Sequence, residues 1–139
     1  MRLTELTQNK YIVPKRYNGA KVVVAVSLPN LVGDMWGGSW NISPIGEIII
    51  FIERKFVDAC IKHNMSIEIE NTISHEYYEC KRAIILARSK YPKLNPYLMA
   101  EKDTNLGGEA HLLTVKEHNK MSEGDYDRML NKLYAKIGL

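Results

Sequence analysis

Apolar residues recur every three or four positions between Glu68 and Ser89, and this periodicity constrains the fold more than any other feature of the chain. Residues at such spacing lie along one side of an α-helix. The set comprises Ile69, Ile73, Tyr77, Cys80, Ile84 and Ala87. Tyr91-Pro92 ends the pattern, because proline cannot continue a helix. The sequence therefore predicts one long helix that buries one side in a core.

The segments before this helix favour strands. Lys21–Val26 is β-branched and apolar, and Tyr11–Val13 is a shorter candidate. Glu47–Ile52 gives the strongest strand prediction, and its continuous apolar character indicates a strand covered on both faces. Between them, the glycine-rich stretch Gly33–Asn41 is interpreted as a loop or an irregular edge.

The remaining segments favour helices. A short helix from Lys55 is expected to turn Phe56, Ala59, Cys60 and His63 to one face and to end at Asn64. Further helices are predicted at 97–100, at 109–120 and from Ser122 onward, the last with a capping-box-like start. Strands first and helices afterwards predict an α+β fold, in which a small antiparallel or mixed sheet packs against three to four helices.

The composition narrows the class of protein. A chain of 139 residues fits a single domain covering residues 1–139. Two cysteines are too few for a disulfide framework, so Cys60 and Cys80 are interpreted as buried thiols. The polar start Met1–Glu5 indicates no signal segment, and the longest apolar run, Ile48–Ile52, is too short to cross a membrane. These features predict a cytoplasmic protein, or one in the host cytoplasm if it is viral.

The charge of the chain does not indicate a nucleic-acid partner. The net charge is only +3, and the basic residues are spread along the chain without forming a basic arm. Neither a nucleic acid nor a membrane is therefore expected as a partner, and the sequence leaves the oligomeric state open.

The residues most able to carry chemistry lie on the long helix. His75 and Glu79 are four positions apart, so they project from neighbouring turns and can bind one metal ion, for which zinc is the natural candidate. Glu76 leans to the side of this pair, where a carboxylate can act as general base on a water molecule. A second interpretation is a solvated face on which Glu76 and Glu79 pair with Lys81 and Arg82.

The run from His75 to Glu79 resembles the H-E-x-x-H helix of zincin metallopeptidases, with glutamate at the second histidine. It is also similar to small phage and bacterial proteins in which H-E-x-x-E precedes an Ala-His pair on the next helix. The resemblance implies a zinc peptidase acting on a peptide or protein, with His111 as third ligand and Glu76 as base. It also implies that Glu47–Ile52 lies beside the helix and can pair with substrate.

The pattern departs from the family at two ligands. Most zincins have histidine where this chain has Glu79, and gluzincins have glutamate where it has His111. His111 is preferred to His118 because it is expected in the first turn of its helix, just after Gly107-Gly108. His118 is expected to cap the helix or to pair with a carboxylate such as Glu76. Glu109 and Glu117 are reserve ligands.

Two other functions remain open: a non-catalytic metal-stabilised domain, and a metal-free interaction module of viral or plasmid type. Trp36 and Trp40 flank a glycine-rich segment and are interpreted as a cover for the core or as part of a binding loop. Tyr78, beside the motif, is expected to be half-exposed. His63 is expected to have a structural role at the end of its helix.

Overall fold

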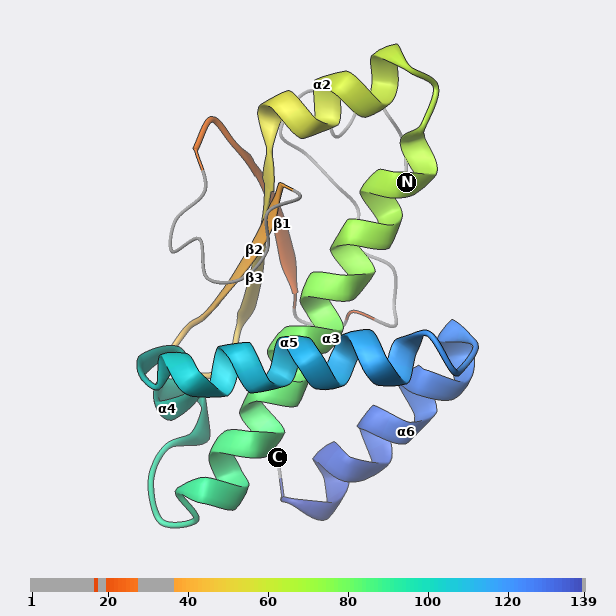
Figure 1. Cartoon of the computed structure of the whole chain (residues 1–139). Coiled ribbons are helices and arrows are strands. Elements are labelled where there is room, and N and C mark those ends of the chain that lie inside the picture. Colours follow the sequence, from red (N-terminus) through yellow and green to blue (C-terminus); the bar gives the residue numbers. More distant parts are fainter. Residues whose placement is uncertain (1–16, 18–19, 28–36, 139) are drawn as a thin grey trace. The chain divides into compact units, whose positions relative to one another are not determined.

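The computed structural model describes residues 17, 20–27 and 37–138, and in this part of the chain three strands precede five helices (Figure 1). The strands are β1 (Lys21–Ala25), β2 (Gly38–Ile42) and β3 (Ile48–Glu53). The helices are α2 (Arg54–Lys62), α3 (Ser66–Lys90), α4 (Pro96–Lys102), α5 (Thr104–His118) and α6 (Glu123–Lys136). This order confirms the predicted α+β class. The strand predicted at Tyr11–Val13 lies outside the described residues.

Contacts divide the chain into two compact units. The first comprises Met1–Asn41 and Glu47–Tyr77, and the second comprises Ile42–Gly46 and Tyr78–Leu139. Helix α3 runs without a break from the first unit into the second. The expectation that residues 1–139 form a single domain stays a prediction.

The sheet is mixed, with the strand order β1-β3-β2. Strand β1 pairs with β3 in parallel, so that Val22 lies opposite Ile50. A tight turn joins β2 to β3, in which the N–H of Gly46 donates to the oxygen of Ser43 at 2.9 Å. The backbone N–H of Glu53 donates to the oxygen of Gly37 at 2.7 Å, so these two strands are antiparallel. Inward-facing residues of β3 are buried and those between them are half-buried. The central strand is therefore fully covered on one face, not on both as predicted.

The structure corrects two expectations about the strands. The glycine-rich segment predicted as a loop or an irregular edge contains most of β2, a regular strand that lies at the edge of the described sheet. The strand expected to pair with substrate, Glu47–Ile52, forms the central β3, so both of its edges are already bonded to neighbouring strands. Trp40 is half-buried in β2, whereas Trp36 lies outside the described residues.

Gly38 explains why a glycine-rich segment forms a strand here. A Cβ at this position would lie 2.7 Å from Cγ2 of Thr72 and 3.0 Å from Cγ of Glu76, both on α3. Only glycine allows the backbone to approach the helix so closely. The start of β2 therefore packs directly on the face of α3 that carries Glu76.

Helix α2 ends as the sequence predicts. Asn64 has φ 57°, and its N–H donates to the carbonyl of Ile61 while that of Met65 donates to Cys60. These two bonds form a Schellman motif, in which asparagine tolerates the left-handed conformation. The buried face was predicted only in part: Cys60 is buried as expected, but Ala59 is exposed and Val57 is buried instead.

Helix α3 confirms the periodicity argument. All six residues of its predicted apolar side are almost completely buried. Three charged residues of the helix are buried as well: Glu76 is 1% exposed, Glu79 2% and Arg82 8%. The alternative of a solvated, charge-paired face is therefore wrong for these residues. A helix that is buried around so much of its circumference is enclosed by other segments of the chain.

The helices of the second unit begin at side-chain caps. Asn95 caps α4, Asp103 caps α5 and Ser122 caps α6, the last by accepting from the N–H of Asp125. The cap of α6 confirms the predicted start. Helix α5, in contrast, begins five residues before the predicted Glu109, so that Gly107 and Gly108 lie inside it.

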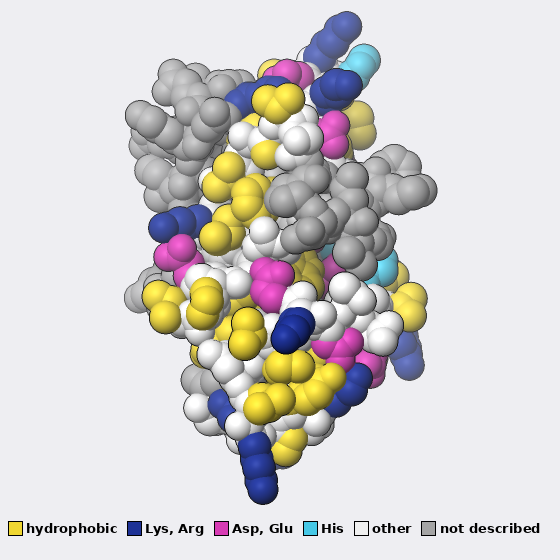
Figure 2. All heavy atoms as spheres, turned by 90° about the vertical axis from the view of Figure 1, so that its left-hand side faces the viewer, with side chains coloured by type: hydrophobic (Ala, Val, Ile, Leu, Met, Phe, Trp, Pro, Cys, Tyr) yellow, Lys and Arg dark blue, Asp and Glu magenta, His cyan; other side chains and the backbone are white. Residues whose placement is uncertain are grey.

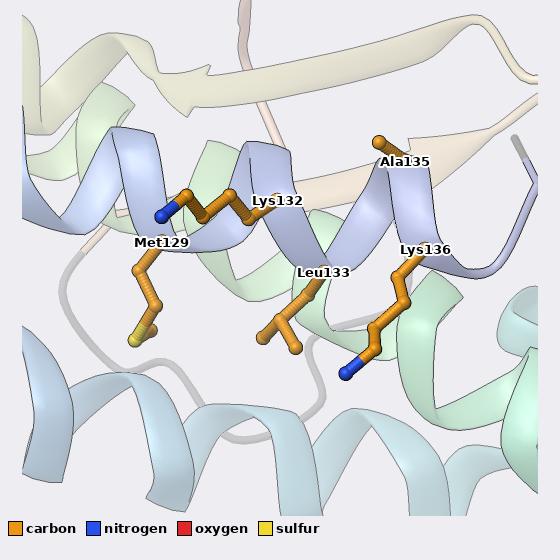
Figure 3. Close-up of a pocket in the computed structure, with 5 residues that line it drawn as sticks. All are labelled: Met129, Lys132, Leu133, Ala135 and Lys136. Carbon is orange, nitrogen blue, oxygen red and sulfur yellow. The ribbon is translucent and has the colours of Figure 1, made fainter.

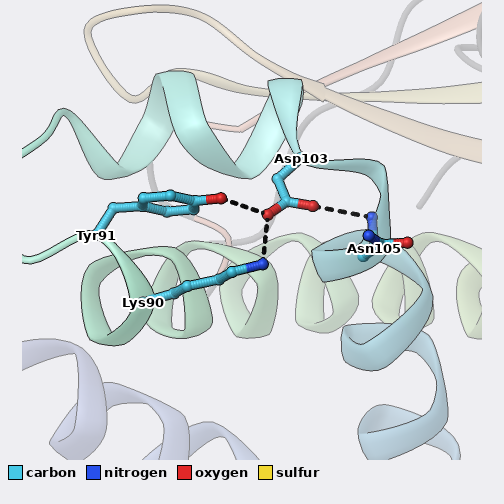
Figure 4. Close-up of polar contacts among 4 residues, drawn as sticks. All are labelled: Lys90, Tyr91, Asp103 and Asn105. Atoms are coloured by element: carbon cyan, nitrogen blue, oxygen red, sulfur yellow. Dashed lines mark hydrogen bonds and ion pairs between the residues drawn. The ribbon is translucent and has the colours of Figure 1, made fainter.

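Asp103 explains this early start of α5 (Figure 4). One carboxylate oxygen accepts from the backbone N–H of Asn105 at 3.1 Å, and the other accepts from Lys90 at 2.9 Å and from Tyr91 at 2.7 Å. The Lys90 ammonium and the Tyr91 hydroxyl lower the pKa of Asp103. A cap tied to the end of α3 can start a helix despite the two glycines that follow it.

The surface carries apolar as well as charged side chains, as the face drawn in Figure 2 shows. The most exposed large apolar residues are Val26, Ile45 and Leu112. Isolated residues of this kind are common on proteins. Among the described helices, none combines the length and the apolar character needed to cross a bilayer.

Candidate metal centre

His75 and Glu79 are placed by a single helix. Both belong to α3, four residues apart, and neighbours at this spacing face the same side. Their relative position thus follows from helix geometry alone. His75 is half-buried, while Glu79 is almost fully enclosed. The pair therefore offers one accessible imidazole and one buried carboxylate.

His111 of α5 meets this pair at Glu79. Its Nδ1 lies 2.9 Å from Oε2 of Glu79, within hydrogen-bonding distance. The side chain of His111 is 28% exposed and that of Glu79 is 3% exposed. The contact joins two residues that are 32 positions apart in the chain and so depends on how α5 lies against α3.

The three side chains together form a set of metal-ligand type. One donor atom from each of His75, Glu79 and His111 lies within 4.8 Å of the others. Imidazole nitrogen and carboxylate oxygen are normal zinc donors, and three protein ligands leave a fourth position open. The structure therefore brings together the three residues that the sequence selected, while metal binding itself stays a prediction.

His111 was chosen because it was expected in the first turn of its helix, and this reason was wrong. The residue chosen is nevertheless the one that reaches Glu79. His111 lies about two turns into α5, not in its first turn, and a side chain added at Gly108 would meet nothing within 4 Å. Both glycines lie inside the helix and are therefore not a connector that steers His111 toward α3. Instead, the buried residues Ala110 and Thr114 turn this side of α5 inward, with His111 beside them.

His118 belongs to an aromatic cluster with Tyr78 and Tyr126. Its ring stacks on Tyr126 with centroids 5.3 Å apart and meets the edge of Tyr78 at 5.2 Å. Tyr78 is fully buried, which corrects the expectation of half exposure. These contacts place His118 in packing between helices. Its expected pairing with Glu76 stays a prediction.

Glu76 occupies the position next to His75 and is 1% exposed. Its Cγ lies 3.0 Å, and its Oε1 3.1 Å, from where a Cβ on Gly38 would stand. The carboxylate is therefore held by packing against the start of β2. This fixed position beside the ligand pair is compatible with the role of a base, which stays a prediction.

The partner of Arg82 was not predicted from the sequence. Nη2 of Arg82 lies 2.5 Å from Oε1 and 2.6 Å from Oε2 of Glu117, so one guanidinium nitrogen bridges both carboxylate oxygens. Glu117, expected as a reserve ligand, is therefore engaged by Arg82, and Glu109, the other reserve, is exposed. An arginine three residues after Glu79 on the predicted helix was the available signal, but its partner lies 35 residues away.

A hollow on α6 offers no chemistry comparable to that of His75, Glu79 and His111 (Figure 3). Its volume is about 620 Å³, and it is lined by Met129, Lys132, Leu133, Ala135 and Lys136. None of these lining side chains is a carboxylate, an imidazole or a thiol. The hollow therefore lacks the donors that a metal site requires.

Comparison of the chain with protein-family models, with curated proteins and with solved structures found no match. A functional conclusion must therefore come from the geometry and chemistry of the residues themselves.

Proposed function

We propose that this chain is a small zinc-dependent peptidase of zincin type, in which His75, Glu79 and His111 hold the metal and Glu76 is the general base. The observation that carries the proposal is the approach of three donor atoms from α3 and α5 to within 4.8 Å of one another. A peptide or protein is the corresponding substrate.

The donor set suits zinc in both chemistry and charge. Two imidazoles and one carboxylate are ligands that zinc accepts at bond lengths of about 2.0–2.2 Å. Burying a carboxylate is costly unless a cation or hydrogen bonds compensate for it. Glu79 is only 2% exposed, so a divalent cation at this point would supply compensating charge.

Hydrolysis requires a base and a place for the peptide. Bound zinc would polarise the peptide carbonyl and acidify the attacking water. Glu76 takes the proton from that water and passes it to the leaving amine. Strand β2 starts beside Glu76 and is the edge of the described sheet, so it replaces Glu47–Ile52 as the strand that an extended peptide would pair with.

One observation favours a second candidate, a metal-stabilised domain without catalysis. Glu76 is 1% exposed and packed against Gly38, so substrate must reach an enclosed carboxylate. In this alternative the same three ligands hold zinc and raise stability, but no peptide is cleaved. The metal-free interaction module differs from both, because it predicts no zinc in the purified protein.

Metal analysis and peptide cleavage separate these functions. Protein purified without added zinc should contain the metal and cleave an unstructured protein substrate. Glu76→Gln should keep the zinc and lose cleavage by about 10²–10⁴-fold, because glutamine preserves the shape and removes the base. Glu109→Gln removes an exposed carboxylate two residues from His111 and should change neither property.

The results have distinct meanings. Zinc without cleavage supports the metal-stabilised domain. Absence of zinc from protein exposed to excess metal contradicts both metal-dependent functions. Cleavage by Glu76→Gln at the wild-type rate would remove Glu76 from the mechanism.

A further inference from the structure

We infer that the ion pair between Arg82 and Glu117 positions His111 at the metal site by fixing how α5 lies on α3. This inference rests on the proposed zinc-binding function. It assigns to both residues a positioning role, since neither is among the three ligands.

Two polar contacts that join α3 to α5 lie close together. His111 meets Glu79 at 2.9 Å, and Glu117 meets Arg82 at 2.5 Å. Glu79 and Arg82 are separated by about 4.5 Å along α3, whereas His111 and Glu117 are separated by about 9 Å along α5, at 1.5 Å per residue. The two helices therefore cross at an angle, as Figure 1 shows.

A crossing of this kind needs a second fixed point. If His111 and Glu79 were the sole contact, α5 could pivot about it and carry the imidazole away from the position that binding requires. The Arg82–Glu117 contact lies nearly two turns further along α5 and prevents this rotation. The cluster of Tyr78 with His118 supports the same end of α5 through ring packing, at a centroid distance of 5.2 Å.

The pair is well suited to hold one geometry. The side chain of Arg82 is 9% exposed and that of Glu117 is 25% exposed, so water competes little for the contact. A guanidinium is planar, and a charge-assisted contact to both carboxylate oxygens fixes direction as well as distance. Tyr126 of α6 lies beside the pair: burial raises the pKa of its hydroxyl, Glu117 adds to this rise, and Arg82 and Thr114 oppose it.

The pair also keeps a competing cation from the metal ligand. Arg82 follows Glu79 by three residues on α3, a spacing at which opposite charges attract. Glu117 engages the guanidinium from the other side. Loss of Glu117 would therefore release a positive charge toward the carboxylate that is to bind zinc.

Zinc affinity measured by competition with a chelator tests this inference in the full chain. Glu117→Gln and Arg82→Gln should each weaken zinc binding by about 10–100-fold, the range found for residues that orient metal ligands. The double variant should lose no more zinc affinity than the single variant that binds zinc more weakly, because the two residues act as one pair. Arg128→Gln removes an exposed pair with Asp125 within α6 and serves as the control, with unchanged affinity.

The thermal midpoint without zinc is measured in parallel, because a merely structural role would lower it while leaving the zinc affinity unchanged. If a single variant fails to fold because one charge is left buried, the double variant, which removes both charges, still gives a result. Wild-type affinity in both the singles and the double, or effects that add in the double, would overturn the inference. Failure of the wild-type protein to bind zinc would instead overturn the proposed function on which the inference rests.

Discussion

Replacement of Glu79 by glutamine tests the metal centre most directly. Glu79 is 2% exposed and lies 2.9 Å from Nδ1 of His111, so glutamine can occupy the same space and keep a hydrogen bond to the ring. The substitution removes the negative charge that a divalent cation would need. We therefore expect little change in the stability of the zinc-free protein and a large change in its response to zinc.

At a zinc concentration one hundred times the dissociation constant, binding stabilises the native state by about 2.7 kcal/mol. Unfolding entropy of about 2.1 cal/mol/K per residue amounts to roughly 0.29 kcal/mol/K for 139 residues. Zinc should thus raise the Tm of the wild-type protein by about 9 °C. A variant with roughly 100-fold weaker binding would gain about 0.4 kcal/mol, or roughly 1 °C, at the same zinc concentration.

Thermal unfolding followed by circular dichroism, with chelator and then with increasing zinc, measures both numbers. Glu109→Gln is the matched control, because it removes an exposed carboxylate from α5 and leaves the three ligands intact. Equal zinc-induced shifts in the wild-type and Glu79→Gln proteins would show that Glu79 is not a ligand. A shift lost equally in the Glu109 variant would point to non-specific binding by surface carboxylates.

Two further predictions concern stability. Ser122→Ala should lower the free energy of unfolding by about 1 kcal/mol, because Ser122 accepts the N–H of Asp125 at the start of α6; urea unfolding would contradict this if the midpoint did not move. Burial raises the pKa of Glu101, and the hydrogen bond that its carboxylate accepts from the Ile42 N–H opposes this rise. The free energy of unfolding should therefore fall as the pH rises from the ordinary glutamate pKa through the raised pKa of the folded protein. Glu101→Gln keeps an acceptor and should flatten this dependence, which unfolding curves at pH 4 to 7 would detect.

Local patterns were sufficient to predict several elements. The apolar spacing from Ile69 to Ala87 placed α3, because a helix repeats every 3.6 residues and buries one side. The β-branched runs placed β1 and β3 through the shape of their side chains. Asn64 and Ser122 marked helix ends, since each acts on backbone groups only a few residues away.

Elements that depend on distant contacts were predicted less well. Strand β2 was taken for a loop or an irregular edge, because Gly38 is required by the approach of α3, which the local sequence does not reveal. The start of α5 was missed, since its cap is held by Lys90 and Tyr91 from the end of another helix. In both cases a contact between segments outweighed the low helix or strand propensity of glycine.

The candidate site shows the same division. The sequence alone determined that His75 and Glu79 share one side of a helix, because four residues make about one turn. Only the tertiary structure decided that Glu76, Glu79 and Arg82 are buried, that His111 reaches Glu79, and that Glu117 engages Arg82. Burial and long-range pairing are set by how helices cross, and that arrangement minimises the free energy of the whole chain and is not encoded in any one segment.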